Sequence, residues 1–218
     1  MSAVVGTGGV PGASGGRARG AATRRRLADA ALEVLGEQGL RAMTHARVDA
    51  AAGVPRGTAS NHYRTRDALV DGAVQRVVER ERAVWDDFAS SSASMRTGAP
   101  PGDRVGAVVE VVLVWLQRAA GQDRAMHVAR YALMLEAARD PAVLRALRAG
   151  RSRTEAWVQD ALRDCGARDP LTACRVLLTH LEGTLLHLVT APGSDVEWAQ
   201  VTSDLRGLVD SLLEAEPD

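Results

Sequence analysis

Cysteine, aromatic residues and long apolar runs are all scarce in this 218-residue sequence. The two cysteines, Cys165 and Cys174, are too few for a disulfide framework, and their separation matches no metal-ligand spacing. No window holds the roughly 20 uninterrupted apolar residues of a membrane span, and the N-terminus lacks the apolar core of a secretory signal. We therefore expect a cytoplasmic protein with no metal site and no contact with a membrane.

Aromatic residues make up 3% of the chain, whereas hydrophobic residues make up 46%, so the core must consist mainly of Ala, Leu and Val. A chain of this length can form one large domain or a small domain joined to a larger one. We find no nucleophile–base constellation, no set of metal ligands and no cofactor-binding loop in the sequence. We therefore expect a protein that is not an enzyme and uses no cofactor.

The net charge is zero, but the charges are unevenly placed. Residues 1–66 carry ten arginines and four acidic residues, whereas the remainder carries 17 arginines and 23 acidic residues. A basic N-terminal part fits a module that contacts nucleic-acid phosphates, joined to a module that does not. A chance scatter of surface charge is the alternative.

Every long segment has helical periodicity and none has the alternation of a strand, so we predict an all-α fold. The glycine-rich residues 1–20 predict a disordered tail. Thr23 can cap a helix from Arg24 to about Gln38. The segment 66–88 predicts a long helix, followed by a loop over 89–102. Further helices are expected over 103–120, 123–138, 140–165, 170–190 and 194–213.

The stretch from Thr44 to Tyr63, THARVDAAAGVPRGTASNHY, predicts two short helices joined by a tight turn. Thr44 can cap the first helix, and Gly53 can end it because glycine adopts the left-handed conformation without penalty. Pro55 stands where the second helix would begin. That second helix is short and polar, and its partner is rich in alanine. This arrangement is typical of a helix-turn-helix, whose second helix enters the DNA major groove.

The run GVPRGTASNHYRTRDALV, residues 53–70, resembles the signature of the TetR family of transcriptional repressors. The preceding RRRLADAALEVLGEQGLRAMT, residues 24–44, is similar to the family's first helix and the link after it. The resemblance covers about the first third of the chain. It implies a three-helix DNA-binding domain over residues 21–66 and a larger helical domain over residues 67–218 that binds a ligand and dimerises.

Arg56 stands at the start of the predicted recognition helix, where a guanidinium can grip the O6 and N7 edge of a guanine. Gly57 allows the backbone to approach the duplex closely, while Thr44 and Arg66 stand at helix N-termini, which favour phosphate. The complete set of candidate DNA-contacting residues is Arg24, Thr44, Arg47, Pro55, Arg56, Gly57, Thr58, Ser60, Asn61, His62, Tyr63 and Arg66.

Two residues depart from the family pattern. Ala46 stands where many relatives carry a base-reading arginine, so the first helix of the pair is expected to read less sequence here. Asp49 stands where relatives usually have a small apolar residue beneath the recognition helix. It could pair with Arg56 or a nearby arginine, or it could repel phosphate, and both alternatives stay open.

The resemblance also implies a ligand pocket in the C-terminal bundle. The candidate lining residues are Trp115, Met126, Arg130, Met134, Trp157, His180 and His187. Each of these also fits a plainer role in the core, in a salt bridge or in a dimer seam. The low aromatic content favours an apolar or amphipathic ligand, and the helix 66–88 is the element expected to link this pocket to the DNA-binding unit.

The penultimate helix is apolar on more than one face, through Leu171, Cys174, Leu177, Leu178, Leu181, Leu185 and Leu188. This pattern predicts a homodimer through the last two helices. The leading hypothesis is a ligand-responsive repressor that binds a palindromic DNA operator as a homodimer and is released by a small-molecule effector. The alternative is a DNA-binding regulator without a small-molecule ligand, controlled by a protein partner or acting architecturally.

Overall fold

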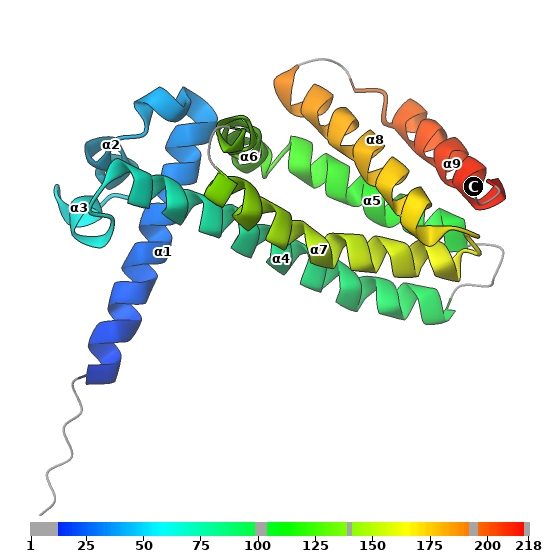
Figure 1. Ribbon diagram of the computed structural model, residues 1–218, viewed down its shortest axis with the longest axis horizontal. Helices are drawn as coiled ribbons and strands as arrows, with labels where there is room; N and C mark the ends of the chain where they lie inside the picture. The colour runs from blue at the N-terminus through cyan, green and yellow to red at the C-terminus, as the bar shows by residue number, and fades with distance from the viewer. Residues whose placement is uncertain (1–12, 99–103, 139–140, 192–195, 216–218) are drawn as a thin grey trace, which may run out of the picture.

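The computed structural model describes residues 13–98, 104–138, 141–191 and 196–215. In these ranges the regular structure is entirely helical, which confirms the predicted all-α fold. The elements are α1 (Ala13–Gln38), the short 3-10 helix η1 (Leu40–Ala42), α2 (His45–Ala51), α3 (Thr58–His62), α4 (Arg66–Gly98), α5 (Arg104–Ala120), α6 (Arg124–Ala137), α7 (Pro141–Asp164), α8 (Pro170–Thr190) and α9 (Trp198–Glu214). Figure 1 shows a small unit of α1–α3 beside a longer bundle of α4–α9.

One hydrophobic core, called here the N-terminal core, lies between α1, α2, α3, the first half of α4 and one face of α6. α4 contributes buried side chains as far as Val77, and α6 contributes Met126, Ala129 and Leu133. The expected division of the chain after residue 66 therefore does not follow the packing. The beginning of α4 and one face of α6 belong with the helix-turn-helix.

A second core, called here the C-terminal core, fills the bundle between α5, α7, α8 and α9. Most of the apolar residues of α8 are buried in it. Of the seven that suggested a partner chain, only Leu171 is exposed, at 67%. The chain's own core therefore covers most of the apolar surface of α8. The exposed apolar residues of α8 are Leu171, Val176 and Leu186.

α1 begins earlier than its sequence pattern indicates. Residues 13–20 are helical although they fall in the expected disordered tail, whereas residues 1–12 lie outside the described part of the chain. Once the packed part of a helix is formed, each further residue adds a backbone hydrogen bond at low cost. Thr23 consequently lies inside α1 and its hydroxyl donates to the carbonyl oxygen of Arg19, at 3.0 Å, instead of capping the helix. Figure 1 shows this end of α1 projecting from the rest of the molecule.

α4 ends at Gly98, so residues 89–98 are helical and not the expected loop; residues 99–103 lie outside the described ranges. The sequence between Gly72 and Gly98 contains neither glycine nor proline, and nothing local stops the helix. The start of α4 is capped by Thr65, whose hydroxyl accepts from the amide of Ala68 at 3.1 Å. None of the helices in the described ranges is both long and apolar enough to cross a membrane.

Candidate functional site

The helix pair α2–α3 forms much as its sequence indicates, with one shift. The Thr44 hydroxyl accepts from the amide of Arg47 at 3.4 Å, which confirms it as the cap of α2, and Gly53 follows α2 with a φ of 59°. α3, however, begins at Thr58 and not at Pro55. Gly57 has a φ of 89°, and a residue in this left-handed conformation cannot continue a helix. Pro55 and Arg56 therefore lie in the turn before α3.

Asp49 on α2 fixes the start of α3 from beneath. It is 2% exposed, and its two carboxylate oxygens accept from the amides of Gly57 and Ala59, each at 2.7 Å. A carboxylate at a helix N-terminus satisfies amides that lack a partner within the helix and is favoured by the helix dipole. Within the described ranges Asp49 makes no ion pair with Arg56 or another arginine. The predicted ion pair with an arginine is therefore not formed, because the carboxylate caps α3; repulsion of phosphate stays a prediction.

The polar residues around α3 lie on the surface. Arg56, Gly57, Ser60 and Asn61 are exposed, and Thr58 is half-buried. The surrounding basic residues are held in place by neighbouring elements. Arg47 donates to the Gln38 side chain at 2.7 Å, Arg66 donates to the carbonyl oxygen of Leu40 at 3.1 Å, and the Arg24 guanidinium lies 4.7 Å from the centre of the Tyr63 ring. These basic side chains come from α1, α2 and α4, which pack with α3 in the N-terminal core.

Tyr63, one of the candidate DNA contacts, is a core residue. It is 2% exposed, and its hydroxyl donates to the carbonyl oxygen of Arg24 at 3.1 Å. Burial, opposed in part by Arg24, raises its pKa. A Cβ atom at Gly72 would lie 2.4 Å from the Tyr63 ring, so the ring fills the space that this glycine leaves. The tyrosine therefore supports the helix pair from inside instead of contacting DNA, and His62 beside it is half-buried.

A cavity of about 580 Å³ lies between α4, α5, α6, α7 and α8. Its volume falls within the range of about 300–1,000 Å³ that is typical of small-molecule sites. Four of the predicted lining residues do line it, namely Trp115, Met126, Arg130 and Met134.

The other three predicted lining residues lie elsewhere. Trp157 packs against the C-terminal core, while His180 and His187 are exposed on α8. The side of α8 that faces the cavity carries Leu178, Leu181 and Glu182. Residues seven apart share a face of a helix, and both histidines belong to a face turned away from the cavity.

Sequence reasoning also missed polar residues of the cavity wall, among them Glu81, His127 and Glu182. Helical spacing offered a signal for His127, because Arg130 and Met134 follow it on the same face of α6. No such signal exists for Glu81 and Glu182, since their contacts depend on how three helices pack.

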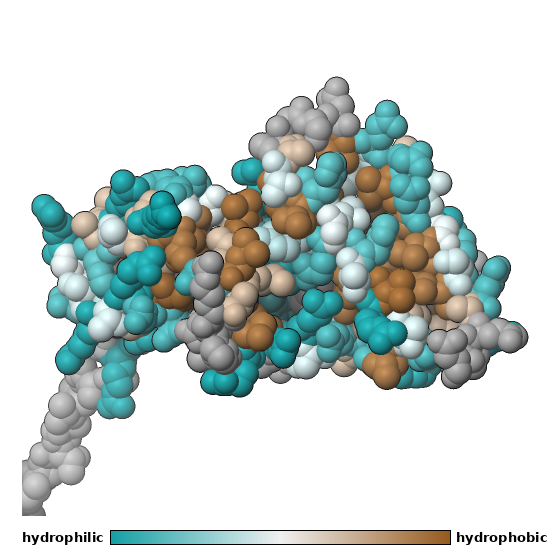
Figure 2. Space-filling model, turned by 45° about the horizontal axis from the view of Figure 1, so that its top comes forward, coloured by the Kyte–Doolittle hydropathy of each residue, from teal (hydrophilic) through white to brown (hydrophobic). Residues whose placement is uncertain are grey.

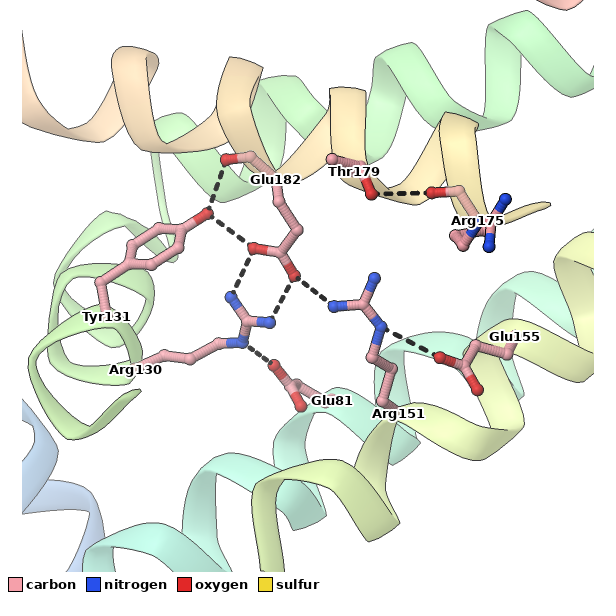
Figure 3. Close-up of polar contacts among 8 residues, drawn as sticks. All are labelled: Glu81, Arg130, Tyr131, Arg151, Glu155, Arg175, Thr179 and Glu182. Atoms are coloured by element: carbon pink, nitrogen blue, oxygen red, sulfur yellow. Dashed lines mark hydrogen bonds and ion pairs between the residues drawn. The ribbon is translucent and has the colours of Figure 1, made fainter. Parts of the chain in front are cut away.

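Ion pairs connect four helices along this wall (Figure 3). Arg130 on α6 contacts Glu81 on α4 at 2.6 Å, and its two terminal nitrogens donate to the Glu182 carboxylate on α8 at 2.9 and 2.6 Å. Arg151 on α7 lies 3.5 Å from the same carboxylate and donates to Glu155 at 3.2 Å. We call these five residues the ion-pair chain. Its order along the wall is Glu81, Arg130, Glu182, Arg151 and Glu155.

The pKa values differ along the ion-pair chain. Burial raises the pKa of Glu81, and the single guanidinium beside it offsets this only in part. Burial also acts to raise the pKa of Glu182, but hydrogen bonds from Arg130 and Tyr131 outweigh it and the net shift is downward. Burial opposes the charge of Arg130, yet the two carboxylates raise its pKa. Glu81 is therefore the least stabilised charge of the three.

His127 occupies the wall beside this chain and is 4% exposed. Its ring meets that of Trp115 edge to face, with the centroids 5.9 Å apart. Burial and the nearby charge of Arg130 lower its pKa from 6.5 to about 4, so the imidazole is neutral at pH 7. Its Nδ1 atom is buried without a hydrogen-bond partner in the described structure. A ligand in the cavity would meet a neutral ring with unused hydrogen-bonding capacity.

The fold and these two sites define a class of protein in which a helix-turn-helix is joined to a helical bundle that holds a ligand-sized cavity. Two family models match the chain. The model described as "Bacterial regulatory proteins, tetR family" covers residues 27–73, and "Tetracyclin repressor-like, C-terminal domain" covers residues 101–215. The chain belongs to the TetR family of transcriptional regulators, which combine a DNA-binding domain with a ligand-binding C-terminal domain.

Individual relatives agree with this family. The HTH-type transcriptional regulator BetI of Rhizobium meliloti is 32% identical over 88 residues, an alignment that spans 40% of each chain. A TetR-family regulator of Mesorhizobium loti has the same fold, with a TM-score of 0.72 over 90% of this chain and 97% of its own at 16% identity. The multidrug binding protein EbrR, crystallised with ethidium, is 29% identical, with a TM-score of 0.56 over 87% of this chain and 97% of its own.

Proposed function

We propose that this protein is a ligand-responsive repressor that binds a near-palindromic operator as a homodimer and is released when a small molecule enters the cavity. The observation that carries this proposal is the position of the cavity. Its walls include α4 and α6, and both helices also pack in the N-terminal core beside the helix-turn-helix. A molecule that moves these walls therefore acts on the elements that hold α3.

α6 is a second link between the cavity and the DNA-binding unit, in addition to the α4 helix expected from the sequence. α1 packs closely against it at Gly36, where a Cβ atom would lie 2.1 Å from the carbonyl oxygen of Ala125. Only a glycine allows the two backbones to come this close. A displacement of α6 by a ligand at Met126 or Arg130 would be passed to α1, and from α1 to α2 and α3.

On the DNA side we assign base reading to Arg56, with Ser60 and Asn61 as further contacts, because these exposed residues lie together at α3. Arg24, Arg47 and Arg66 are assigned to phosphates because they surround that helix. The two α3 helices of a dimer would occupy successive major grooves, with half-sites about 34–36 Å apart. Because the operator is intracellular DNA, this function requires a cytoplasmic location.

The homodimer is assigned to α8 and α9. On α8 the exposed residues Leu171, Val176 and Leu186 remain available to a second copy. Figure 2 shows hydrophobic patches, interleaved with hydrophilic residues, over the bundle half of the molecule. This apolar surface is smaller than the sequence indicated, and the family's usual assembly supports the dimer as much as the surface does.

Operator binding tests the proposal directly. Footprinting on the DNA that flanks the gene would identify the site, and fluorescence anisotropy would then give its affinity with and without effectors. Arg56→Ala should weaken binding by about 1–3 kcal/mol per half-site and relax one base preference, whereas Arg66→Ala should weaken all sequences alike. An operator affinity that no cavity-binding compound alters would instead favour a regulator controlled by a protein partner or one that acts architecturally.

A further inference from the structure

The charges of the cavity wall point to the class of molecule that fits inside. We propose, on the premise of the ligand-responsive function above, that the cavity binds a small organic cation with an apolar body and that Glu81 neutralises it. Four features of the wall carry this inference: the charge balance of the ion-pair chain, the contacts of Glu81, the contacts of Arg130, and the state of His127.

The ion-pair chain contains three carboxylates and only two guanidiniums, and it ends in a carboxylate on each side (Figure 3). Glu155 forms the outer end, with a side chain 45% exposed to water. Glu81 forms the inner end, with a side chain 18% exposed. The excess negative charge therefore lies at the buried end of the wall, where water screens it least.

The remaining charged residues of the cavity do not offset this excess. Arg118 and Asp123 pair with each other at 2.8 Å, so their charges cancel locally. Arg148 is exposed, and solvent screens its charge. The buried end keeps one uncompensated negative charge.

Glu81 has capacity for a second cationic partner. Among the described residues it forms an ion pair with Arg130 alone, through one carboxylate oxygen, and in Figure 3 the other oxygen makes no contact with the residues drawn. Burial raises the pKa of this carboxyl group because one guanidinium does not fully stabilise its charge. A ligand cation next to the second oxygen would supply the second positive charge that the Glu81 carboxylate lacks.

An anionic ligand fits this wall less well. Each nitrogen of the Arg130 guanidinium already contacts a carboxylate, so an anion would have to displace Glu81 or Glu182. Such an anion would also approach a wall with an excess of negative charge, and the repulsion would oppose its binding.

His127 provides an independent sign of a ligand. It is more than nine-tenths buried in the cavity wall, and its Nδ1 atom has no partner in the described structure. Unpaired buried polar atoms are uncommon and point to a group that is absent from the protein alone. The ring is neutral and does not repel a cation, while Trp115, Met126 and Leu181 supply apolar contacts for the ligand body.

The test compares ligands of matched shape and different charge on the full-length protein. Isothermal titration calorimetry would measure the affinity of tetraphenylphosphonium, a cation, of tetraphenylborate, an anion of nearly the same shape, and of neutral triphenylphosphine oxide. Tetraphenylphosphonium should bind about tenfold or more tightly than either of the others, because only the cation gains from the Glu81 charge. None of the three is a planar intercalator, so the same compounds are suitable for operator assays.

Three variants identify the responsible carboxylate. Glu81→Gln removes the charge with little change of shape and should weaken tetraphenylphosphonium about tenfold while leaving triphenylphosphine oxide unchanged. Glu81→Asp keeps the charge and should stay within about threefold of the wild type, and so should Asp160→Asn, which removes a water-screened charge of α7 that does not line the cavity. Circular dichroism would confirm that each variant is folded.

Equal or tighter binding of the anion or the neutral compound to the wild-type protein would overturn the proposal without any variant. An unchanged tetraphenylphosphonium affinity in folded Glu81→Gln would overturn the role of Glu81. Operator affinity measured on the same samples distinguishes a failure of the cation proposal from a failure of the proposed ligand-responsive function. If the anion or the neutral compound released the protein from its operator, the ligand-responsive function would stand and the preference for a cation would be wrong. If the cation bound but left operator affinity unaltered, only the control of DNA binding by a ligand would be wrong.

Discussion

The N-terminal core and the cavity wall differ in how completely their buried polar groups are paired. Around the helix-turn-helix the buried polar atoms are paired. Both oxygens of Asp49 accept amide hydrogen bonds, and the Tyr63 hydroxyl donates to a carbonyl. In the cavity wall, among the described residues, Nδ1 of His127 is unpaired and Glu81 has a single partner.

From this difference we expect the helix-turn-helix to be rigid and the cavity wall to respond to a ligand. A fully paired polar network specifies a single arrangement, because any movement leaves a buried group without its partner. A partly paired wall keeps free energy that a ligand can recover when it supplies the missing contacts. The two kinds of packing meet on α6. One face of it belongs to the N-terminal core, and it carries both of the buried side-chain atoms that lack partners in the described structure, Arg124 Nε and His127 Nδ1.

Asp49→Ala is expected to have the largest effect on the helix-turn-helix, because it removes the carboxylate that caps α3. It should lower the free energy of unfolding by about 2–4 kcal/mol, because the amides of Gly57 and Ala59 lose their acceptor. Operator affinity should fall with it, since α3 loses its anchor. Urea denaturation and fluorescence anisotropy would measure both effects. Asp71→Ala, at an exposed site on α4, is the matched control; equal stability of the two variants would show that the cap does not hold α3.

The stability of the folded protein should depend on pH through His127 in the cavity wall. Its pKa is lowered from 6.5 to about 4 in the folded protein, so the unfolded chain binds the proton more readily between these values. Folded-state stability is therefore greatest above about pH 6.5 and should fall by up to about 3 kcal/mol as the pH drops towards 4.

Urea denaturation between pH 7 and 4 would measure this loss in the wild type and in His127→Asn, which cannot titrate at this site. The variant should lack the His127 share of the loss, while His180→Asn, at an exposed position, should follow the wild type. Parallel curves for the wild type and His127→Asn would contradict a lowered pKa at His127.

The close approach of α1 and α6 connects the two regions, and Gly36→Ala should disturb it. The added Cβ atom would meet the Ala125 carbonyl oxygen at 2.1 Å, and forcing the helices apart should cost about 1–3 kcal/mol of stability. Gly20→Ala places the same methyl group on α1 with no atom within 4 Å, and should instead stabilise the helix by up to about 1 kcal/mol. Thermal unfolding would distinguish the two. If both variants gained stability, the contact would be looser than described.

The smallest expected effect concerns the cap of α2. Thr44→Ala should lower the free energy of unfolding by about 0.5–1 kcal/mol, at the weak end for a cap. The reason is the long bond of 3.4 Å between its hydroxyl and the Arg47 amide. Thr44→Ser keeps the hydroxyl and should retain most of the stability in the same urea titration. A loss of stability as large as that of Asp49→Ala would mean that Thr44 does more in the helix-turn-helix than cap α2.

Local chemistry in the sequence determined much of this protein. Glycine and hydroxyl caps, such as Gly53 and Thr65, act within a few residues, and helical periodicity marks which side of each helix is apolar. These signals identified the helix-turn-helix and the all-α fold, while the family resemblance implied a pocket, of which four candidate residues do line the cavity. They failed where a helix continued without a local stop signal, as α4 does to Gly98.

Only the tertiary structure decided what the buried charges do. The sequence left Asp49 as an ion-pair partner or a source of phosphate repulsion, and only the position of α3 shows that its carboxylate caps that helix. Glu81, Arg130 and Glu182 come from three helices that lie far apart in the sequence, and each alone has the pattern of an ordinary surface residue. The physical reason is that burial and pairing depend on distances between helices, whereas periodicity and capping depend only on neighbours along the chain.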